Sequence, residues 1–131
     1  MKAVEHMTIY FNLLSALEPK LLKLTPKDDM IYKKFRETFP DLSIGVLNME
    51  DLKSSDAKEK WRPFCTEFEG LVEDFNYATM LRVDPNKDYS EDNSVVVPRV
   101  QFLAIEIARN REGHNDSVRK LFGKAKERQT E

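Results

Sequence analysis

The chain has 131 residues, of which 40% are hydrophobic and 34% are charged, and its formal net charge is −2 at pH 7. A chain of this length and composition is expected to form one soluble globular domain with a core of its own. Its single cysteine, Cys65, excludes an internal disulfide framework and any zinc or iron–sulfur site built from several cysteines. A lone thiol is typical of a reducing compartment, so the expected localisation is cytoplasmic.

The N-terminal segment has none of the features of a targeting sequence. Glu5, His6 and Asn12 interrupt its apolar residues, whereas a signal peptide needs an uninterrupted apolar stretch. Nowhere does the sequence approach the ~20 apolar residues that a membrane-spanning helix requires. We therefore expect no membrane partner.

Two helices are predicted in the first part of the chain. The first covers Val4–Leu17, where apolar residues at helical spacing form two adjoining stripes and predict a wide buried face. The second starts at Thr25, whose hydroxyl can cap it, with Pro26 in the first turn, and it stops before Pro40. The stripes of the first helix are Val4, Met7, Phe11 and Leu14, beside Tyr10, Leu13 and Leu17.

The middle of the chain predicts a short strand and then a long helix. The strand covers residues 43–47 and is weakened by Gly45. Asn48 or the pair Ser54/Ser55 can cap the helix that follows. Pro63 lies inside this helix and predicts a kink or a split. The apolar residues that define its period are Ala57, Trp61, Phe64, Phe68 and Leu71.

The last part of the chain predicts two antiparallel strands, at 77–83 and 94–97, joined by a polar loop. Residues 98–111 fit both a strand and a helix, and Pro98 and Gly113 favour the helix. The predicted fold class is therefore α+β, a helix-rich single domain with a small antiparallel sheet built from 43–47, 77–83 and 94–97. Residues 1–115 are expected to form the globular domain, and 116–131 a basic C-terminal helix or frayed tail.

No catalytic or cofactor site is predicted. The two histidines, His6 and His114, lie near opposite ends of the chain, and no glycine-rich phosphate-binding loop is present. The acidic loop 84–92 fails as a calcium site because Tyr89 and Val95 stand where glycine and glutamate are needed. Cys65 is best explained as core packing. We therefore predict a protein that is not an enzyme, with no cofactor and no metal.

Two segments carry residues that are typical of interfaces. Residues 59–65 include Trp61 and Arg62, and these residue types most often anchor protein interfaces. Residues 101–115 are dense in polar side chains beside an apolar element. The alternative for the first segment is a core tryptophan next to an exposed arginine, and for the second a helix surface. The basic residues toward the C-terminus are diluted by acids, so no specific nucleic acid partner is expected.

Four blocks of sequence carry a resemblance to a known family: Leu22–Thr25, Ala57–Cys65, Val72–Tyr77 and Gln101–Gly113. Together they resemble the eukaryotic polysaccharide-biosynthesis-domain-containing protein 1 family over about residues 1–115. The resemblance implies a small cytosolic protein. It also implies, from a fungal branch of the family, a chaperone for the GTP-binding domain of translation elongation factor 1-alpha, working with the nascent polypeptide-associated complex at the ribosome.

The motif blocks also suggest the partner-binding residues. Trp61 and Arg62 are expected to be the anchors of the interface. The expected polar rim consists of Glu73, Asp74, Asn76, Arg109, Asn110 and Arg111. The alternative function is a role related to polysaccharide biosynthesis, which predicts a pocket where carboxylates converge, at least one with a raised pKa. Those carboxylates are Glu69, Glu73, Asp74 and Glu106.

Overall fold

Helices dominate the computed structural model, which describes residues 2–118 and, from residue 8 onward, their side chains. The helices are α1 (Lys2–Ala16), α2 (Asp28–Thr38), α3 (Glu50–Lys53), α4 (Ser55–Thr66), α5 (Arg99–Glu112) and the short α6 (Asp116–Val118). The other elements are the 3₁₀ turns η1 (Pro19–Leu21) and η2 (Glu91–Asn93) and the strands β1 (Ala78–Arg82) and β2 (Ser94–Pro98). This arrangement confirms the predicted helix-rich α+β class.

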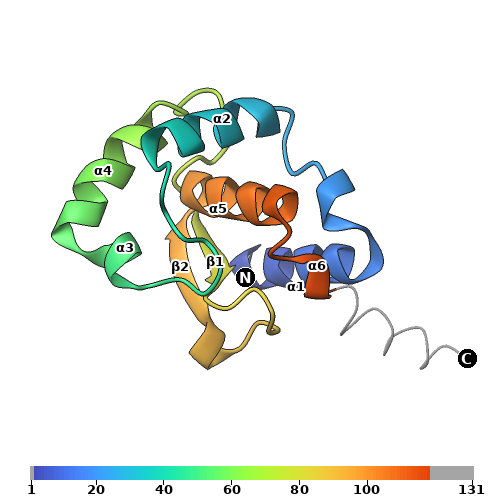
Figure 1. The fold of residues 1–131 in the computed structure, drawn as a ribbon. Helices are drawn as coiled ribbons and strands as arrows, with labels where there is room; N and C mark the ends of the chain where they lie inside the picture. Colours follow the sequence, from blue (N-terminus) through green and yellow to red (C-terminus); the bar gives the residue numbers. More distant parts are fainter. Residues whose placement is uncertain (1, 119–131) are drawn as a thin grey trace, which may run out of the picture.

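The central element is α5. Every residue from Val100 to Asn110 is buried, and Figure 1 shows α5 in the middle of the domain, surrounded by α1, α2 and the sheet. Pro98 precedes its first turn, and Gly113 ends it in the left-handed conformation at φ 91°, with its N–H donating to the Arg109 carbonyl. The ambiguous segment 98–111 is therefore a helix, as its two end signals favour.

The sheet has two antiparallel strands in the described part of the chain, with Ala78 opposite Pro98 and Arg82 opposite Ser94. This confirms the pairing predicted for 77–83 and 94–97. The strand predicted over 43–47 is wrong, because that segment is an irregular loop. The Arg109 guanidinium binds the carbonyls of Ile44 and Gly45 at 2.7 and 3.0 Å, so they are not free to extend the sheet. A single bond from Leu47 N–H to the Val83 carbonyl, 2.9 Å, ties the loop to the end of β1.

A side-chain cap marks the start of α4, whereas α2 begins without one. The Thr25 hydroxyl accepts from Lys27 N–H at 2.8 Å, but α2 begins three residues later than predicted, at Asp28. The Ser54 hydroxyl caps α4 by accepting from Ala57 N–H at 3.1 Å, as predicted. The helix continues through Pro63 and ends at Thr66. The predicted extension to Leu71 is wrong, since residues after Thr66 form turns and the Leu71 side chain is exposed.

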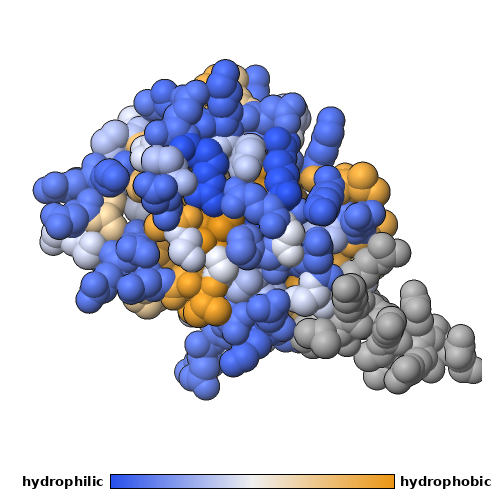
Figure 2. Space-filling model, viewed as in Figure 1, coloured by the Kyte–Doolittle hydropathy of each residue, from blue (hydrophilic) through white to orange (hydrophobic). Residues whose placement is uncertain are grey.

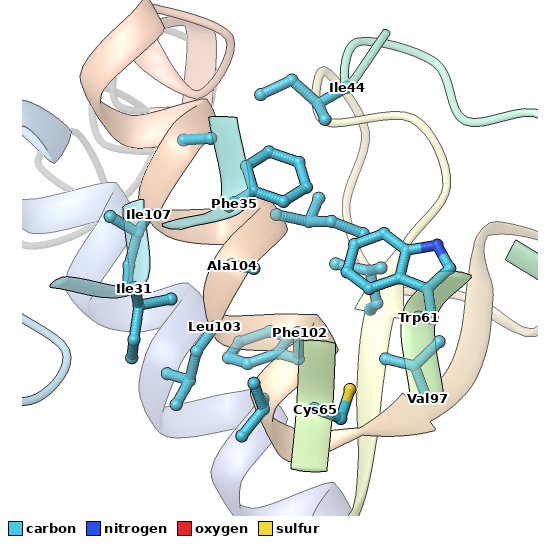
Figure 3. Packing of buried hydrophobic residues seen from close by; sticks show 14 of the residues in the cluster. Ile31, Phe35, Ile44, Trp61, Cys65, Val97, Phe102, Leu103, Ala104 and Ile107 are labelled. Carbon is cyan, nitrogen blue, oxygen red and sulfur yellow. The ribbon is translucent and has the colours of Figure 1, made fainter. Parts of the chain in front are cut away.

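An aromatic stack joins α2 to α4 in the core. The rings of Phe39 and Trp61 are stacked with centroids 4.3 Å apart, and Phe35 lies 5.7 Å from Trp61. Figure 3 shows Phe35 and Trp61 pointing toward one another. These large buried rings supply much of the apolar surface that stabilises the domain.

From residue 8 onward, the first predicted helix buries fewer side chains than predicted, and the side chains of Val4 and Met7 lie outside those described. Tyr10 and Leu14 are buried, whereas Leu13 and Leu17 are 42% and 48% exposed, so the second predicted stripe is partly outside the core. Figure 2 shows a mainly hydrophilic face with a few apolar patches. None of the helices described is long and apolar enough to span a membrane. Of the predicted C-terminal segment 116–131, α6 is described and 119–131 lie outside the described residues.

Candidate functional site

A buried polar cluster lies at the centre of the domain. Its members come from α1, β1, α5 and the turn after α5, and all of them are at most 3% exposed. Charged side chains are rarely buried unless they are paired. Three ionisable groups with no exposed surface therefore make this the most unusual feature of the core. The cluster consists of Tyr10, Arg82, Glu106, Arg109, Asn110 and Asn115.

Glu106 is the centre of the buried polar cluster. One carboxylate oxygen accepts from Tyr10 Oη at 2.6 Å and from Asn115 Nδ2 at 2.9 Å, and the other accepts from Arg109 at 2.9 Å. Burial by itself would raise the pKa of Glu106. The guanidinium groups of Arg109 and Arg82 and the hydrogen bonds from Tyr10 and Arg109 outweigh burial, so the pKa lies below its usual value. The carboxylate is therefore ionised and fully engaged by the protein itself.

Arg109 uses its guanidinium to hold the backbone together. Besides Glu106, it donates to the carbonyls of Ile44, Gly45, Arg82 and Val83 over 2.7 to 3.1 Å. These four acceptors belong to the loop before α3 and to the end of β1. Arg109 therefore fixes the loop against the sheet from the last turn of α5.

Arg82 holds the turn after β1 in the same way. It donates to the carbonyls of Pro85 and Lys87 at 2.8 and 3.1 Å, and to Asn115 Oδ1 at 2.7 Å. Its guanidinium lies over the rings of Phe11 and Tyr89, 5.5 and 5.7 Å from their centroids. The side chains of the buried polar cluster thus bond to one another and to nearby backbone carbonyls, and they stabilise the fold.

The predicted partner-binding residues fall into two groups. Trp61, Arg109 and Asn110 are 3%, 0% and 2% exposed. The prediction that Arg109 and Asn110 belong to a surface rim is therefore wrong. Both lie in the core, because α5 is buried on all sides and Glu106 pairs with Arg109. Trp61 is a core residue whose indole N–H donates to the Asp51 carbonyl at 3.1 Å. The exposed members are Arg62, Glu73, Asp74, Asn76 and Arg111.

Arg111 is exposed but already has partners on the chain. It donates to Asp29 at 2.6 Å and lies over the Tyr32 ring, 5.2 Å from its centroid. Hydrogen bonding to Arg111 lowers the pKa of the exposed Asp29 carboxyl. Arg111 therefore joins the end of α5 to α2 and lies away from the other predicted residues.

The carboxylates of the alternative function do not converge. Glu106 is fully buried, and its pKa is lowered rather than raised. Asp74 lines a hollow beside Thr79 and Phe102, whereas Glu73 lines a different one beside Pro26. Among the described residues, no group of three or more His, Cys, Asp or Glu side chains could hold a metal ion.

Trp61, Arg62 and Asn76 do meet, at a surface groove that we call the basic groove. It has a volume of about 490 Å³ and lies between α3 and α4 on one side and the start of α5 on the other. Lys53, Lys58 and Arg62 line it, and no acidic side chain does. The remaining lining residues are Leu52, Trp61, Cys65, Thr66, Phe75, Asn76, Pro98 and Gln101.

The sequence interpretation did not assign three polar residues of this groove to the interface: Lys53, Lys58 and Gln101. Lys58 stands four residues before Arg62, so both lie on one face of a helix, and this spacing was the available signal. Gln101 is 4% exposed, and its Nε2 has no hydrogen-bond partner in the described structure. Cys65 belongs to the buried core cluster, as predicted, and burial raises the pKa of its thiol to about 11.

The fold and these sites together define a small α+β domain that is braced by a buried ionic cluster and carries a surface groove. The chain belongs to the family described as PBDC1 protein, whose model matches residues 1–120. It is 56% identical over 117 residues to Protein PBDC1 of Mus musculus and 56% identical over 118 residues to that of Homo sapiens. These matches cover 89% and 90% of this chain but only 59% and 51% of the mouse and human proteins.

Fungal relatives match over more of their length. The PBDC1 homolog of Schizosaccharomyces pombe is 42% identical over 123 residues, which cover 91% of this chain and 84% of that protein. A solution NMR structure of a Saccharomyces cerevisiae protein superposes with a TM-score of 0.82 at 41% identity, covering 90% of this chain and 84% of that one. The fold described above is therefore also found in a solved structure.

Proposed function

We propose that this protein is a chaperone that binds the GTP-binding domain of translation elongation factor 1-alpha while that domain folds. The proposal takes its client from the family resemblance. The observation that carries it is the basic groove, where Trp61, Arg62 and Asn76 from two of the resembling blocks meet beside uncompensated cations. Such a surface supplies both apolar contact and charge to a partner.

The proposed mechanism is that of a holdase. A partly folded domain exposes apolar surface that drives aggregation. A protein that binds this surface protects it, and affinity is lost when native packing covers it. In this proposal, binding of GTP completes the packing of the client domain and releases it. The nascent polypeptide-associated complex and the ribosome are the proposed cytosolic partners that deliver the client.

We propose no catalytic step. The Glu106 carboxylate is occupied by Tyr10, Arg109 and Asn115 within the core. Glu73 and Asp74 line separate hollows, and Glu69 is exposed. The groups available at the groove are cations, amides and a neutral thiol, which bind and orient rather than transfer protons at neutral pH.

The test is cell-free synthesis of the client GTP-binding domain in an extract depleted of PBDC1 proteins. Adding the purified chain is expected to raise the soluble, protease-resistant yield, and adding GTP is expected to release the client from the chain. An equal mass of ovalbumin is the control for non-specific protection. No gain over ovalbumin, or a complex that GTP leaves intact, would contradict the proposal.

A matched pair of variants tests whether the groove is the binding surface. Lys58→Glu/Arg62→Glu reverses two charges in the groove, and Lys20→Glu/Lys33→Glu reverses two exposed charges elsewhere. The first pair is expected to lose the gain in yield and the second to keep it. If both pairs keep it, the chaperone role stands but the groove is not its site.

A further inference from the structure

We propose that the basic groove binds a short acidic segment of a partner protein, with an aromatic or aliphatic side chain of that segment seated on its floor. This inference goes beyond the proposed function because it fixes the chemistry of the ligand. It holds for whichever protein supplies the segment.

No acidic side chain in the described part of the protein balances the charge of the groove. Lys53, Lys58 and Arg62 line it without any acidic residue. Within the described part of the protein, Lys58 and Arg62 form no ion pair, and Lys53 Nζ donates only to the Val96 carbonyl at 2.7 Å. Uncompensated cations around a concave surface attract an anionic ligand.

A second hollow of the same size provides the contrast. It also has a volume of about 490 Å³ and touches α3 and α4, but it is lined by four acids and one lysine. The charged residues around α3 and α4 are therefore segregated, with acids at one hollow and bases at the other. The acids of the second hollow are Asp41, Glu50, Asp51 and Asp56.

The floor of the groove is apolar. Leu52, Trp61, Phe75 and Pro98 contribute to it, and Leu52 and Trp61, both 3% exposed, also belong to the core. A volume of about 490 Å³ falls in the range of ligand pockets and accommodates one or two large side chains. A ligand that is only charged would leave this floor in water, so the segment must also carry an apolar residue.

An unpaired donor lies at the same place. Gln101 is 4% exposed, lines the groove, and leaves Nε2 without an acceptor among the described residues. It stands in the first turn of α5, whose positive end has no acidic residue and no side-chain cap. A carboxylate oxygen that reaches the floor would pair with the amide and meet the favourable end of the helix dipole.

A protein segment fits this groove better than RNA. Proteins that bind single-stranded nucleic acid stack bases on exposed aromatic rings. The Trp61 ring is already stacked on Phe39 and Phe35, with centroid distances of 4.3 and 5.7 Å. It is therefore not available to stack a base, whereas the apolar lining as a whole can contact a peptide side chain.

The test is fluorescence anisotropy with a short fluorescein-labelled peptide of alternating glutamate and phenylalanine. We expect Lys58→Glu/Arg62→Glu to weaken binding by at least about tenfold, because it removes two charge pairs with the peptide. Lys20→Glu/Lys33→Glu is expected to stay within about twofold, because it makes the same charge change on exposed residues outside the groove. No elongation factor is present, so a failure here is independent of the proposed function.

The variant Gln101→Met separates binding from folding. It removes the unpaired buried donor, so we expect a higher melting temperature together with about fivefold weaker peptide binding. A purely structural role would not move these two readouts in opposite directions. The proposal is overturned by equal binding of a lysine–phenylalanine peptide, by full affinity in the groove variant, or by displacement of the peptide with polyuridylic acid.

Discussion

The Tyr10 hydroxyl donates a hydrogen bond of 2.6 Å to the Glu106 carboxylate and joins α1 to α5 across 96 positions of the sequence. Both side chains are buried, and burial together with the charge of Glu106 raises the pKa of Tyr10 well above its usual value. The hydroxyl thus remains a donor throughout the neutral range. It links the N-terminal helix to the buried polar cluster, beside the contact between the Phe11 ring and Arg82.

Replacing Tyr10 with phenylalanine tests this link. The variant removes a hydrogen bond to a buried charge, so we expect the free energy of unfolding to fall by about 1.5–3 kcal/mol. Urea unfolding followed by circular dichroism measures it. The matched control is Tyr32→Phe, which removes an exposed bond of 3.0 Å to Glu112 and is expected to cost less than about 0.5 kcal/mol. Equal losses of unfolding free energy in the two variants would show that the buried Tyr10 bond stabilises the fold no more than the exposed one.

The stability of the fold should decrease in acid because of Glu106. Its pKa in the folded chain lies below the usual value of 4.5, since the arginines outweigh the effect of burial. A lowered folded pKa contributes stability that is present above the unfolded pKa and is lost as pH falls through the folded pKa. We expect the free energy of unfolding to decline below about pH 4.5, measured by urea unfolding across a pH series.

Glu106→Gln identifies the source of this pH dependence. The variant leaves Arg82 and Arg109 buried without their anion, so at pH 7 we expect a loss of about 3–5 kcal/mol. Its stability should also change less between neutral and acidic pH than that of the natural chain. Glu37→Gln, at an exposed position, is the control for loss of one charge. A Glu106→Gln chain that keeps both the full stability and the full acid dependence would refute the role assigned to this carboxylate.

Local signals in the sequence were sufficient for most of the fold. The caps at Ser54 and Gly113 and the alternation in 77–83 each act within a few residues, and the structure has the corresponding helix start, helix end and strand. The segment 43–47 shows where local signals fail. Its alternation is strand-like, but its conformation is set by Arg109, which is 65 positions away from Ile44. No local sequence pattern predicts a contact between residues so far apart in the chain.

The placement of the candidate site residues was harder to predict for a related reason. Arginine is usually exposed, so the sequence alone predicts Arg109 at the surface. Its burial beside Glu106 is seen only in the structure. Arg82 was not singled out at all, although it has no exposed surface. By contrast, Trp61 and Arg62 fit the alternative stated from the sequence, a core tryptophan beside an exposed arginine.

Replacing Gly113, which ends α5, is expected to destabilise the domain more than replacing Gly45. Its φ of 91° is a conformation that residues with a Cβ rarely adopt, so Gly113→Ala is expected to destabilise the domain by about 1 kcal/mol. Thermal unfolding measures the change. Gly45→Ala is the control, because a Cβ there would meet the His114 ring at an ordinary 3.6 Å. A larger loss at Gly45 than at Gly113 would contradict this assignment.

Replacing Trp61 is expected to lower the stability of the fold, and not only the affinity for a partner. Its ring is stacked in the core and its N–H is bonded to the Asp51 carbonyl, so Trp61→Ala is expected to cost about 3–5 kcal/mol. Trp61→Phe keeps the stacking and loses one neutral hydrogen bond, at about 1 kcal/mol. Urea unfolding by circular dichroism compares the two variants. In the natural chain, the emission of this single tryptophan should shift to longer wavelength on unfolding. If Trp61→Ala left stability unchanged and weakened only partner binding, Trp61 would be a surface anchor and its place in the core would be wrong.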